Sequence, residues 1–367
     1  MSTKKENLSQ KALTNLLSLQ KKVDRALEKF FLQEWQKAKK IDRTSVQTLE
    51  IVKEFTLRGG KRLRPALTYF GYQCFRKEFS SKELVRAAMV NEILQSGLLI
   101  HDDIMDQSIL RRGRPTAHLL FEELGRKDFN WPKNFPLRKH FGTSLAICAG
   151  DLCYALMNKI LLESSFANAN QAATQLNQTF KEVIYGQIID ARSGFEKNFS
   201  WQDVLKIYIL KSATYTIEAP LVLGGILAGA PKEKIRAIKK FAFPLGIAFQ
   251  IQDDILDLFG VSSKTGKEEN KDLKEGKKTL LILKTLEKIS SEEKIFLEKH
   301  LGKANLTAAE IEKIKKIIVS SGALNFCQEY SSKLIVQAKK NIEKQNYLPV
   351  GRDFLLGIAD YLLMREG

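Results

Sequence analysis

The chain has 367 residues, of which 44% are hydrophobic and 28% charged, the ordinary balance of a globular protein with ample material for a core. Lysine and arginine outnumber aspartate and glutamate by 59 to 42, a formal net charge of +17 that suggests anionic partners. The basic residues are interleaved with glutamate, and no dense basic tract with aromatic residues occurs, so we expect no nucleic-acid partner.

Helices are expected along most of the chain, since proline is scarce and apolar residues recur at three- and four-residue steps. The first expected helix covers 8–40. Segments 111–140 and 260–276 collect glycine or proline and are expected as loops. With no repeat of fixed period and no low-complexity linker, we expect one all-α domain over 1–367 that includes the N-terminal helical segment 1–40. Further helices are expected at 81–107, 141–165, 168–191, 201–229, 232–258, 277–300, 308–320, 323–343 and 351–365.

The sequence also bears on the compartment. Residues 1–7 are polar and charged, unlike a secretory signal. The longest weakly polar run, 219–230, is too short to cross a bilayer. The four cysteines lack CxxC spacing and are expected as small buried hydrophobes in a reducing compartment. We therefore expect a cytoplasmic protein without a transmembrane segment.

Two aspartate clusters share one pattern. Asp102-Asp103-Ile104-Met105-Asp106 and Asp253-Asp254-Ile255-Leu256-Asp257 each follow a strongly apolar stretch. Residues four apart share a helix face, where like charges destabilise a helix. One such cluster is as well explained by a solvated helix end. Two with the same spacing indicate a bound cation, and hard carboxylate oxygens suit Mg²⁺, which also takes waters and substrate phosphates as ligands.

Basic segments accompany these clusters. Residues 59–65 (GGKRLRP) precede the first cluster and 111–116 (RRGRPT) follow it, while Lys267, Lys277 and Lys278 follow the second. Glycine lets backbone N–H groups approach an anion, and arginine binds phosphate oxygens in a bidentate manner. Each cation alone is more simply a solvated surface charge, but carboxylates with Mg²⁺ and fixed cations together predict a diphosphate site.

These motifs carry a resemblance. The set GGKRLRP, LLIHDDIMD, RRGRPT, GQ(x)₂D, KS, FQIQDDILDLFG and TGK(x)₄D(x)₄K resembles the trans-polyprenyl diphosphate synthase family, in the family's order from Gly59 to Arg365. The resemblance implies an all-α isoprenoid synthase-like fold, a single large helical bundle in which the two aspartate motifs face each other across a central cavity. It also implies a homodimer, as is common among such enzymes.

The resemblance assigns roles to individual residues. Asp102, Asp106 and Asp253 match direct Mg²⁺ ligands, while Asp103, Asp254 and Asp257 match residues that act as ligands or through water. The residues that match contacts to the allylic diphosphate are Arg111, Lys211, Gln250, Lys267 and Lys277. Those that match the isopentenyl diphosphate pocket are Gly60, Lys61, Arg64, Gln95 and Arg112. Ser212 replaces the threonine usual after the lysine and keeps the hydroxyl, so we expect it to keep a polar contact with substrate.

The activity implied is an Mg²⁺-dependent condensation. The allylic diphosphate (dimethylallyl, geranyl or farnesyl) ionises as Mg²⁺ and the cations stabilise the departing diphosphate. The double bond of isopentenyl diphosphate, held alongside, attacks the carbocation. Loss of a proton then completes a five-carbon extension of an all-trans chain. No protein nucleophile is required.

Two other classes were weighed against a chain-elongating transferase. Terpene cyclases share the helical fold but generally lack the second DDxxD motif and the pocket formed here by Lys61, Arg64 and Arg112. Non-catalytic partner subunits lose aspartates from the motifs, whereas this chain keeps all six. A chain-elongating enzyme of isoprenoid biosynthesis is therefore favoured.

Product length depends on the helix that precedes Asp102. In the family the growing chain descends beside this helix, where Leu94, Gly97 and Leu98 are expected to line its path without an aromatic residue. If Gly97 leaves this space open, Gly97→Phe should shorten the product toward C15; close packing against a neighbouring helix is the alternative. We expect C20, geranylgeranyl diphosphate, with longer chains as the competitor.

Overall fold

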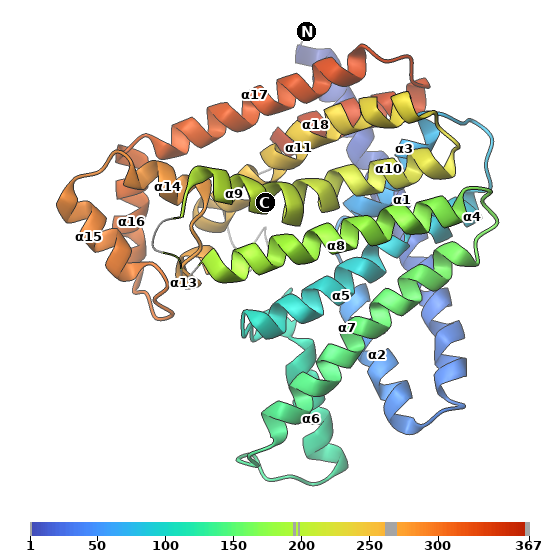
Figure 1. Cartoon of the computed structure of the whole chain (residues 1–367), viewed down its shortest axis with the longest axis horizontal. Helices are drawn as coiled ribbons and strands as arrows, with labels where there is room; N and C mark the ends of the chain where they lie inside the picture. The colour runs from blue at the N-terminus through green and yellow to red at the C-terminus, as the bar shows by residue number, and fades with distance from the viewer. Residues whose placement is uncertain (1, 194–195, 197–198, 261–269, 364–367) are drawn as a thin grey trace. The chain divides into compact units, whose positions relative to one another are not determined.

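The computed structural model describes residues 2–193, 196, 199–260 and 270–363. Helices dominate this part of the chain (Figure 1), so the all-α expectation is confirmed. The one small exception is a two-stranded antiparallel ribbon. The elements are α1 (Ser2–Ala38), α2 (Arg43–Leu57), α3 (Leu63–Gln73), α4 (Ser81–Ala88), α5 (Val90–Met105), β1 (Leu110–Arg111), β2 (Arg114–Pro115), α6 (Ala117–Asp128), α7 (Arg138–Leu162), α8 (Ala169–Ser193), α9 (Trp201–Ile207), η1 (Tyr208–Glu218), α10 (Ala219–Leu227), α11 (Lys232–Phe259), α13 (Lys271–Lys274), α14 (Leu280–Leu286), α15 (Ser291–His300), α16 (Ala308–Ser320), α17 (Ala323–Glu343) and α18 (Pro349–Leu363).

Contacts divide the chain into two compact units. We call the one made of Thr14–Tyr69 and Arg76–Ala173 the N-terminal unit, and the one made of Met1–Leu13, Phe70–Phe75 and Thr174–Gly367 the C-terminal unit. Each is described by itself below. A single domain with a central cavity stays a prediction.

The N-terminal unit is built on three helices, with α5 and α6 both packed against α7. Ile93, Leu94 and Ile100 of α5 are fully buried, and they explain the apolar stretch before the first aspartate cluster. The cluster occupies the last turn of α5, whose C-cap is Asp106. Packing of the apolar part of α5 therefore fixes where these carboxylates stand.

The C-terminal unit is centred on α11, which packs along α17 and against η1. Phe241, Leu245 and Ala248 of α11 are fully buried, and the second aspartate cluster lies in the final turns of this helix. The neighbouring segment η1 is a π-helix of 11 residues. π-Helical segments are rare and occur frequently at functional sites.

Glycines allow η1 to lie close to both of its neighbours. A Cβ on Gly186 of α8 would lie 2.9 Å from the backbone nitrogen of Lys211, and one on Gly246 of α11 would lie 2.5 Å from Cα of Ala213. Real side chains do not tolerate such contacts. The backbone of the Lys211–Ser212 pair is thus held tightly on two sides.

Several expected helix boundaries differ from the structure. Helix α6 lies inside the expected loop 111–140, and α2 and α3 occupy stretches for which no helix was predicted. The expected helix 277–300 is divided into α14 and α15, because Ser290 and Glu293 form a capping box that starts a new helix. The expected helix 201–229 is divided by the change of hydrogen-bonding pattern at Tyr208.

Of the two alternatives left open at Gly97, the structure contradicts open space. A Cβ on Gly97 would lie 2.8 Å from Cε1 of Tyr154, 2.9 Å from Cβ of Cys153 and 3.0 Å from the carbonyl oxygen of Gly150, all on α7. The close-packing alternative therefore holds, and a phenylalanine at 97 has no room where α5 meets α7.

Helix α7 is the one described helix whose length and hydropathy would suffice to cross a membrane. In the structure, 44% of the most apolar 18-residue stretch of this helix is buried. Core helices of soluble proteins satisfy the same two criteria, so this feature by itself is weak evidence for a membrane span.

Candidate active site

In the N-terminal unit, Arg111 clamps the first aspartate cluster. Its Nε donates to Oδ1 of Asp103 at 2.9 Å, Nη2 makes a second, shorter bond to the same oxygen, and Nη2 also approaches Oδ2 of Asp102 at 3.4 Å. Burial lowers the pKa of Arg111, but attraction from Asp103 outweighs it and the pKa is raised. The side chain of Asp103 is fully buried, whereas that of Asp102 retains 18% exposure. Oδ1 of Asp103 is thus occupied by hydrogen bonds from Arg111, and Asp102 is the carboxylate that is more accessible to solvent.

A tight turn between β1 and β2 directs Arg112 toward the segment 59–61. Arg112 and Gly113 both have positive φ, 54° and 71°, as the two-residue turn of a ribbon requires. The guanidinium of Arg112 donates to the carbonyl oxygen of Gly59. Gly60, at φ 116°, leaves room for this contact, since a Cβ there would lie 3.1 Å from Nη2 of Arg112.

Cations crowd around Arg112. Burial lowers its pKa, attraction from Glu92 opposes this effect, and repulsion from Arg62, Arg64 and Arg111 contributes to the lowering. A guanidinium in such surroundings gains from an added anion. This end of the N-terminal unit therefore has the electrostatics of an anion-binding site.

Arg62 anchors the segment that contributes Gly60 and Lys61. Its guanidinium is buried, with Nε 2.7 Å from Asp24, Nη1 2.5 Å from Glu92 and Nη2 donating to the carbonyl oxygen of Thr56 at 3.0 Å. Its positive φ of 53° is a conformation that a non-glycine residue adopts only when its surroundings enforce it. Lys61, next to this anchor, is exposed to solvent.

A pocket in the same unit brings together some of the predicted isopentenyl diphosphate residues. Gln95 and Arg112 line it, with Arg62, Glu92, Arg111 and Thr56. Gly60 borders Arg112 directly, as described above. Lys61 and Arg64 are not among the lining residues, so their part in this pocket stays a prediction.

In the C-terminal unit, Asp254 is turned into the protein. It is buried, accepts from Nε2 of Gln250 at 2.7 Å, and accepts from the hydroxyl of Tyr208. Tyr208 in turn accepts from the backbone nitrogen of Leu280 at 3.0 Å. Burial, followed by repulsion from Asp272, raises the pKa of Asp254 well above its usual value, and burial likewise raises the pKa of Tyr208. Asp253 and Asp257 are only half-buried.

The same hydrogen-bonded chain extends to Ser212, whose hydroxyl donates to Oε1 of Gln250. The replacement of threonine by Ser212 therefore keeps a polar contact, here with another predicted site residue. A continuous path runs from η1 through Gln250 to Asp254 and back to η1 at Tyr208. It fixes the Lys211–Ser212 segment against the helix that carries the second aspartate cluster.

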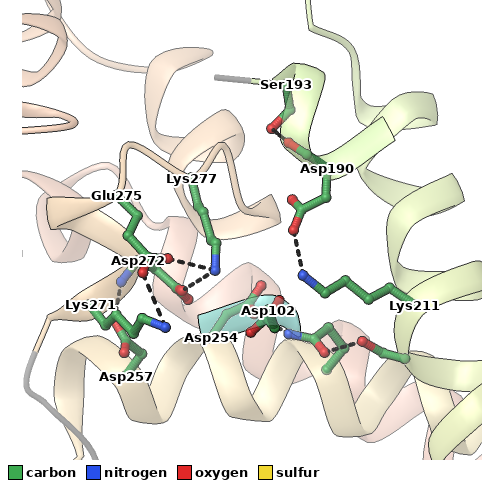
Figure 2. A network of polar contacts seen from close by, with 12 residues as sticks. Asp102, Asp190, Ser193, Lys211, Asp254, Asp257, Lys271, Asp272, Glu275 and Lys277 are labelled. Carbon is green, nitrogen blue, oxygen red and sulfur yellow. Dashed lines mark hydrogen bonds and ion pairs between the residues drawn. The ribbon is translucent and has the colours of Figure 1, made fainter. Parts of the chain in front are cut away.

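Figure 2 shows Lys211 extended toward Asp190 of α8 and Lys277 directed toward Asp272 and Glu275. The Nζ atom of Lys211 lies 2.7 Å from Asp190. That of Lys277 lies 2.7 Å from Glu275 and 3.8 Å from Asp272. Both cations, predicted to contact the allylic diphosphate, are thus held half-buried by carboxylates of their own unit.

Asp257 connects the second cluster to the following segment. Its Oδ2 accepts from the backbone nitrogen of Asp272 at 3.1 Å, and its carbonyl oxygen accepts from the nitrogen of Asn270 at 3.2 Å. Lys267, a further predicted contact to the allylic diphosphate, lies outside the described residues.

The donor chemistry fits Mg²⁺. Asp102 and Asp106 in one unit and Asp253 and Asp257 in the other offer carboxylate oxygens, the ligands that Mg²⁺ prefers. Among the described residues, no three histidine, cysteine or acidic side chains cluster closely enough to form a metal site of their own. A cation that takes water and substrate phosphates as its remaining ligands suits such a sparse donor set.

Three residues of these networks were missed or undervalued at the sequence level. Tyr208, which bonds Asp254, carries no motif signal. Asp190, the last residue of the GQ(x)₂D motif, pairs with Lys211. Glu92, an acidic residue within an apolar helical stretch, is buried against Arg62. An isolated acid in such a stretch predicts a buried partner, and this was the available signal for Glu92.

The chain is similar to several known proteins. The family model described as polyprenyl synthetase matches residues 46–318. The geranylgeranyl pyrophosphate synthase of Geoglobus acetivorans is 31% identical over 310 residues, which cover 84% of this chain and 88% of that protein. The geranylfarnesyl diphosphate synthase of Aeropyrum pernix is 29% identical over 330 residues, 88% of this chain and 95% of that one.

A solved structure is similar over nearly the whole chain. It is the geranylgeranyl pyrophosphate synthase from Corynebacterium glutamicum, complexed with isoprenyl diphosphate and magnesium. The TM-score is 0.87 at 29% sequence identity, with 94% of this chain and 99% of the other covered.

Proposed function

Because this chain belongs to the polyprenyl synthetase family, we propose that it is an Mg²⁺-dependent prenyltransferase that condenses isopentenyl diphosphate with an allylic diphosphate. The product is a longer all-trans prenyl diphosphate. The observation that carries the proposal is that each unit holds an aspartate cluster together with fixed cations. Arg111 bonds the first cluster directly, and Arg112 is held by the carbonyl oxygen of Gly59 in the same unit. In the other unit Lys211 and Lys277 are held by Asp190 and Glu275.

Each group has a role derived from its surroundings. Asp102, Asp106, Asp253 and Asp257 are the residues that would hold Mg²⁺, which when bound stabilises negative charge on the departing diphosphate. Asp190 holds Lys211 and Glu275 holds Lys277. Their positive charges are therefore already positioned before substrate binds, and no side-chain reorganisation is required. Asp103 and Asp254, buried and bonded to Arg111 and Tyr208, act by positioning these groups.

The second substrate is assigned to the crowded cations of the N-terminal unit. Arg112, whose pKa is lowered by burial and by neighbouring arginines, gains most from a bound diphosphate. Gly60 and Gln95 offer a close backbone approach and an amide donor beside it. Lys61, exposed next to the anchored Arg62, supplies a further charge at the rim.

We propose geranylgeranyl diphosphate, a C20 compound, as the main product. Support comes from the Geoglobus acetivorans and Corynebacterium glutamicum proteins, which are both named as geranylgeranyl pyrophosphate synthases. The Aeropyrum pernix protein is named as a geranylfarnesyl diphosphate synthase, so a longer product is the competing outcome.

We also propose a cytoplasmic homodimer. Support comes from α7, where Ile147 and Leu162 are 45% and 58% exposed although the helix is strongly apolar. An exposed apolar face of this kind is typical of a subunit contact. Light scattering at micromolar concentration gives the mass directly, and a monomer there would contradict this part of the proposal.

The test of the activity uses purified protein, Mg²⁺, labelled isopentenyl diphosphate and, in turn, dimethylallyl, geranyl and farnesyl diphosphate. We expect Asp102→Ala and Asp253→Ala each to lower turnover by at least about 100-fold, since each removes charge stabilisation from the ionising step. EDTA should abolish turnover and added Mg²⁺ restore it.

The matched control is Asp128→Ala, which removes an aspartate that pairs with Arg43 in the N-terminal unit. It should retain turnover, and circular dichroism should show that all three variants are folded. Rates near wild type in either motif variant would contradict the assignment, and absence of extension with every primer would contradict the function.

A further inference from the structure

Two turns of the N-terminal unit, the one that joins α1 to α2 and the one that joins α6 to α7, lie at the same end of that unit (Figure 1). Arg43, the first residue of α2, links them, because its Nη2 lies 2.9 Å from Oδ1 of Asp128, the last residue of α6. Nε2 of Gln47 donates to Oδ2 of the same aspartate at 3.1 Å. Residues 37–43 and 126–139 therefore form one surface, which we call the end face.

Aromatic rings give the end face a firm base. Trp131 stacks on Phe129 with ring centroids 4.9 Å apart, and on Phe135 with centroids 4.7 Å apart. Phe141 meets Trp131 edge to face at 5.2 Å. Gly125 of α6 leaves room for these rings, since a Cβ there would lie 2.7 Å from both Phe141 and Trp131. Packing among its own rings thus holds the turn between α6 and α7 in one shape.

Large apolar side chains of the end face remain in solvent. Phe129 is 58% exposed and Leu137 59%, and Ile41, in the other turn, is 75% exposed. Ile41 lies two residues before Arg43, and Phe129 directly follows Asp128, so the ion pair between the two turns brings these tips to one surface. Apolar side chains gathered in this way mark a surface that a partner or a membrane covers.

The end face is also strongly basic, with nine lysine and arginine side chains against two aspartates. Some of these cations pair with glutamates of their own helix, as Arg126 does with Glu123. Lys40, Lys133 and Lys139 are exposed. Positive charge beside exposed apolar side chains is complementary to anionic head groups that lie over acyl chains.

We propose that the end face binds the surface of a membrane that contains anionic phospholipids. Phe129, Leu137 and Ile41 enter the boundary between head groups and acyl chains, and the lysines contact the lipid phosphates. Binding of this kind is peripheral and weakens as salt is added. The inference does not depend on the proposed function, because the end face contains none of the residues assigned to Mg²⁺ or to substrate.

A nucleic acid is the competing anionic partner, because residues 126–139 place rings among basic side chains. This segment corrects the expectation that no basic tract contains aromatic residues. Bases bind to such tracts by stacking on accessible rings. Trp131, however, stacks on rings of the protein, and the exposed tips Ile41 and Leu137 are aliphatic. The exposed groups therefore suit acyl chains better than bases.

The test measures cosedimentation of the full-length protein with sucrose-loaded vesicles. These are made either of phosphatidylcholine alone or of equal parts of phosphatidylcholine and phosphatidylglycerol. We expect a partition coefficient at least about tenfold higher for the anionic vesicles at low salt, and release of the protein at high salt.

Two double variants separate the apolar from the charged contribution. Phe129→Ser/Leu137→Ser should lower the partition coefficient by at least about tenfold, because two apolar side chains no longer leave water. Lys133→Glu/Lys139→Glu should lower it at least as much, because each lysine beside an anionic surface contributes about fivefold. Both proteins should keep the circular dichroism spectrum of the wild type. If the first does not fold, Ile41→Ser replaces it, with an expected loss of at least about threefold.

The matched controls make the same changes at exposed positions of the C-terminal unit, Ile295→Ser/Phe326→Ser and Lys294→Glu/Lys299→Glu. They should bind the anionic vesicles as the wild type does. Equal weakening by the controls and by the end-face variants would place the lipid contact elsewhere and overturn the inference.

Three further results would also overturn it. The first is a wild type that does not sediment with anionic vesicles. The second is binding of a single-stranded oligonucleotide that is tighter than binding of vesicles and is lost in Lys133→Glu/Lys139→Glu. The third is a smaller mass of Phe129→Ser/Leu137→Ser in light scattering together with unchanged vesicle binding, which would make the end face a contact between copies of this chain.

Discussion

The three arginines of 111–114 have three different partners. Arg111 holds Asp103, Arg112 reaches the carbonyl oxygen of Gly59, and Arg114 lies 2.8 Å from Glu54. The side chain of Arg114 is 63% exposed, and an exposed ion pair contributes little to stability. One short basic segment thus contacts the carboxylates proposed to bind Mg²⁺, the proposed anion site and a surface glutamate.

At this scale the two proposed diphosphate sites can be separated by their lysines. Lys61→Ala should raise KM for isopentenyl diphosphate by at least about tenfold and affect the allylic KM less, since a lost charge-assisted hydrogen bond costs about 1.5–3 kcal/mol. Lys211→Ala should do the opposite. Steady-state kinetics with each substrate varied in turn measure both constants.

Lys77→Ala, a change at an exposed lysine outside both sites, serves as the control and should leave both constants unchanged. Equal effects of Lys61→Ala and Lys211→Ala on the two substrates would show that the lysines do not divide between two sites.

The sequence motifs singled out these cations and carboxylates but did not predict how they pair. Spacing along a helix places Asp102 and Asp106 on one face, and this depends only on local geometry. That Asp103 and Asp254 are buried while their neighbours are half-exposed depends on partners outside their own helices, Arg111 of β1 and Tyr208, which is 46 residues away in sequence.

At the element scale, η1 is the least ordinary part of the C-terminal unit. Its π-helical pattern begins at Tyr208 and includes Lys211 and Ser212. Its contacts with α11 run through Gln250 to Asp254 and through the Tyr208 hydroxyl to the same carboxyl. The element therefore couples the position of Lys211 to that of the second aspartate cluster.

Tyr208→Phe tests this coupling. Loss of the hydroxyl leaves the buried Asp254 without one donor and the nitrogen of Leu280 without its acceptor, at a cost of about 1–3 kcal/mol in the free energy of unfolding. We expect a lower Tm, a rise in the allylic KM larger than that for isopentenyl diphosphate, and altered fluorescence of Trp201, whose ring lies 6.4 Å from that of Tyr208.

Tyr347→Phe provides a matched comparison, because Tyr347 is also buried in the C-terminal unit and donates to the carbonyl oxygen of Lys234. It should lower Tm without changing either KM. Identical kinetics for the two tyrosine variants would mean that Tyr208 contributes stability alone.

Periodicity predicted long, uninterrupted helices well and interrupted ones poorly. The expected ranges 308–320 and 323–343 coincide with α16 and α17. Within 201–229 the hydrogen-bonding pattern changes from α to π, but the apolar residues continue at helical spacing. The spacing of side chains over a short segment cannot distinguish the two kinds of helix. Helix α6 was hidden because glycine and proline elsewhere in 111–140 dominated the interpretation of that segment.

At the scale of the whole molecule, three buried cysteines are spread over both units. Cys74, Cys153 and Cys327 are at most 2% exposed, and burial raises the pKa of each thiol to about 12. Cys148 is exposed. The reactivity of the buried thiols with a modifying reagent therefore shows whether both units are folded.

At pH 8, in protein diluted until it is monomeric, a thiol reagent should modify Cys148 alone, and all four cysteines should react after denaturation. The unfolded chain ionises its thiols from about pH 9, while the folded chain keeps three protonated to about pH 12. Stability should therefore fall as pH rises through this window. Mass spectrometry counts the modified thiols, and denaturant titration at several pH values measures the free energy of unfolding.

Cys148→Ser should abolish labelling of the folded protein and leave the alkaline loss of stability unchanged. Rapid modification of two or more cysteines in the folded protein would contradict the burial of these thiols.

The division into units affects which truncated fragments of this protein can fold and when each unit can fold during synthesis. Neither unit is one continuous stretch of chain, and boundaries between them fall inside α1, α3 and α8. In the C-terminal unit the ring of Phe70 stacks on that of Phe354 at 3.9 Å, and Gly351 has no side chain where it meets the backbone of Cys74. A gene fragment that starts at Thr174 lacks these partners. During synthesis on the ribosome, residues 70–75 likewise lack these contacts until α18, nearly 280 residues further along the chain, has been made.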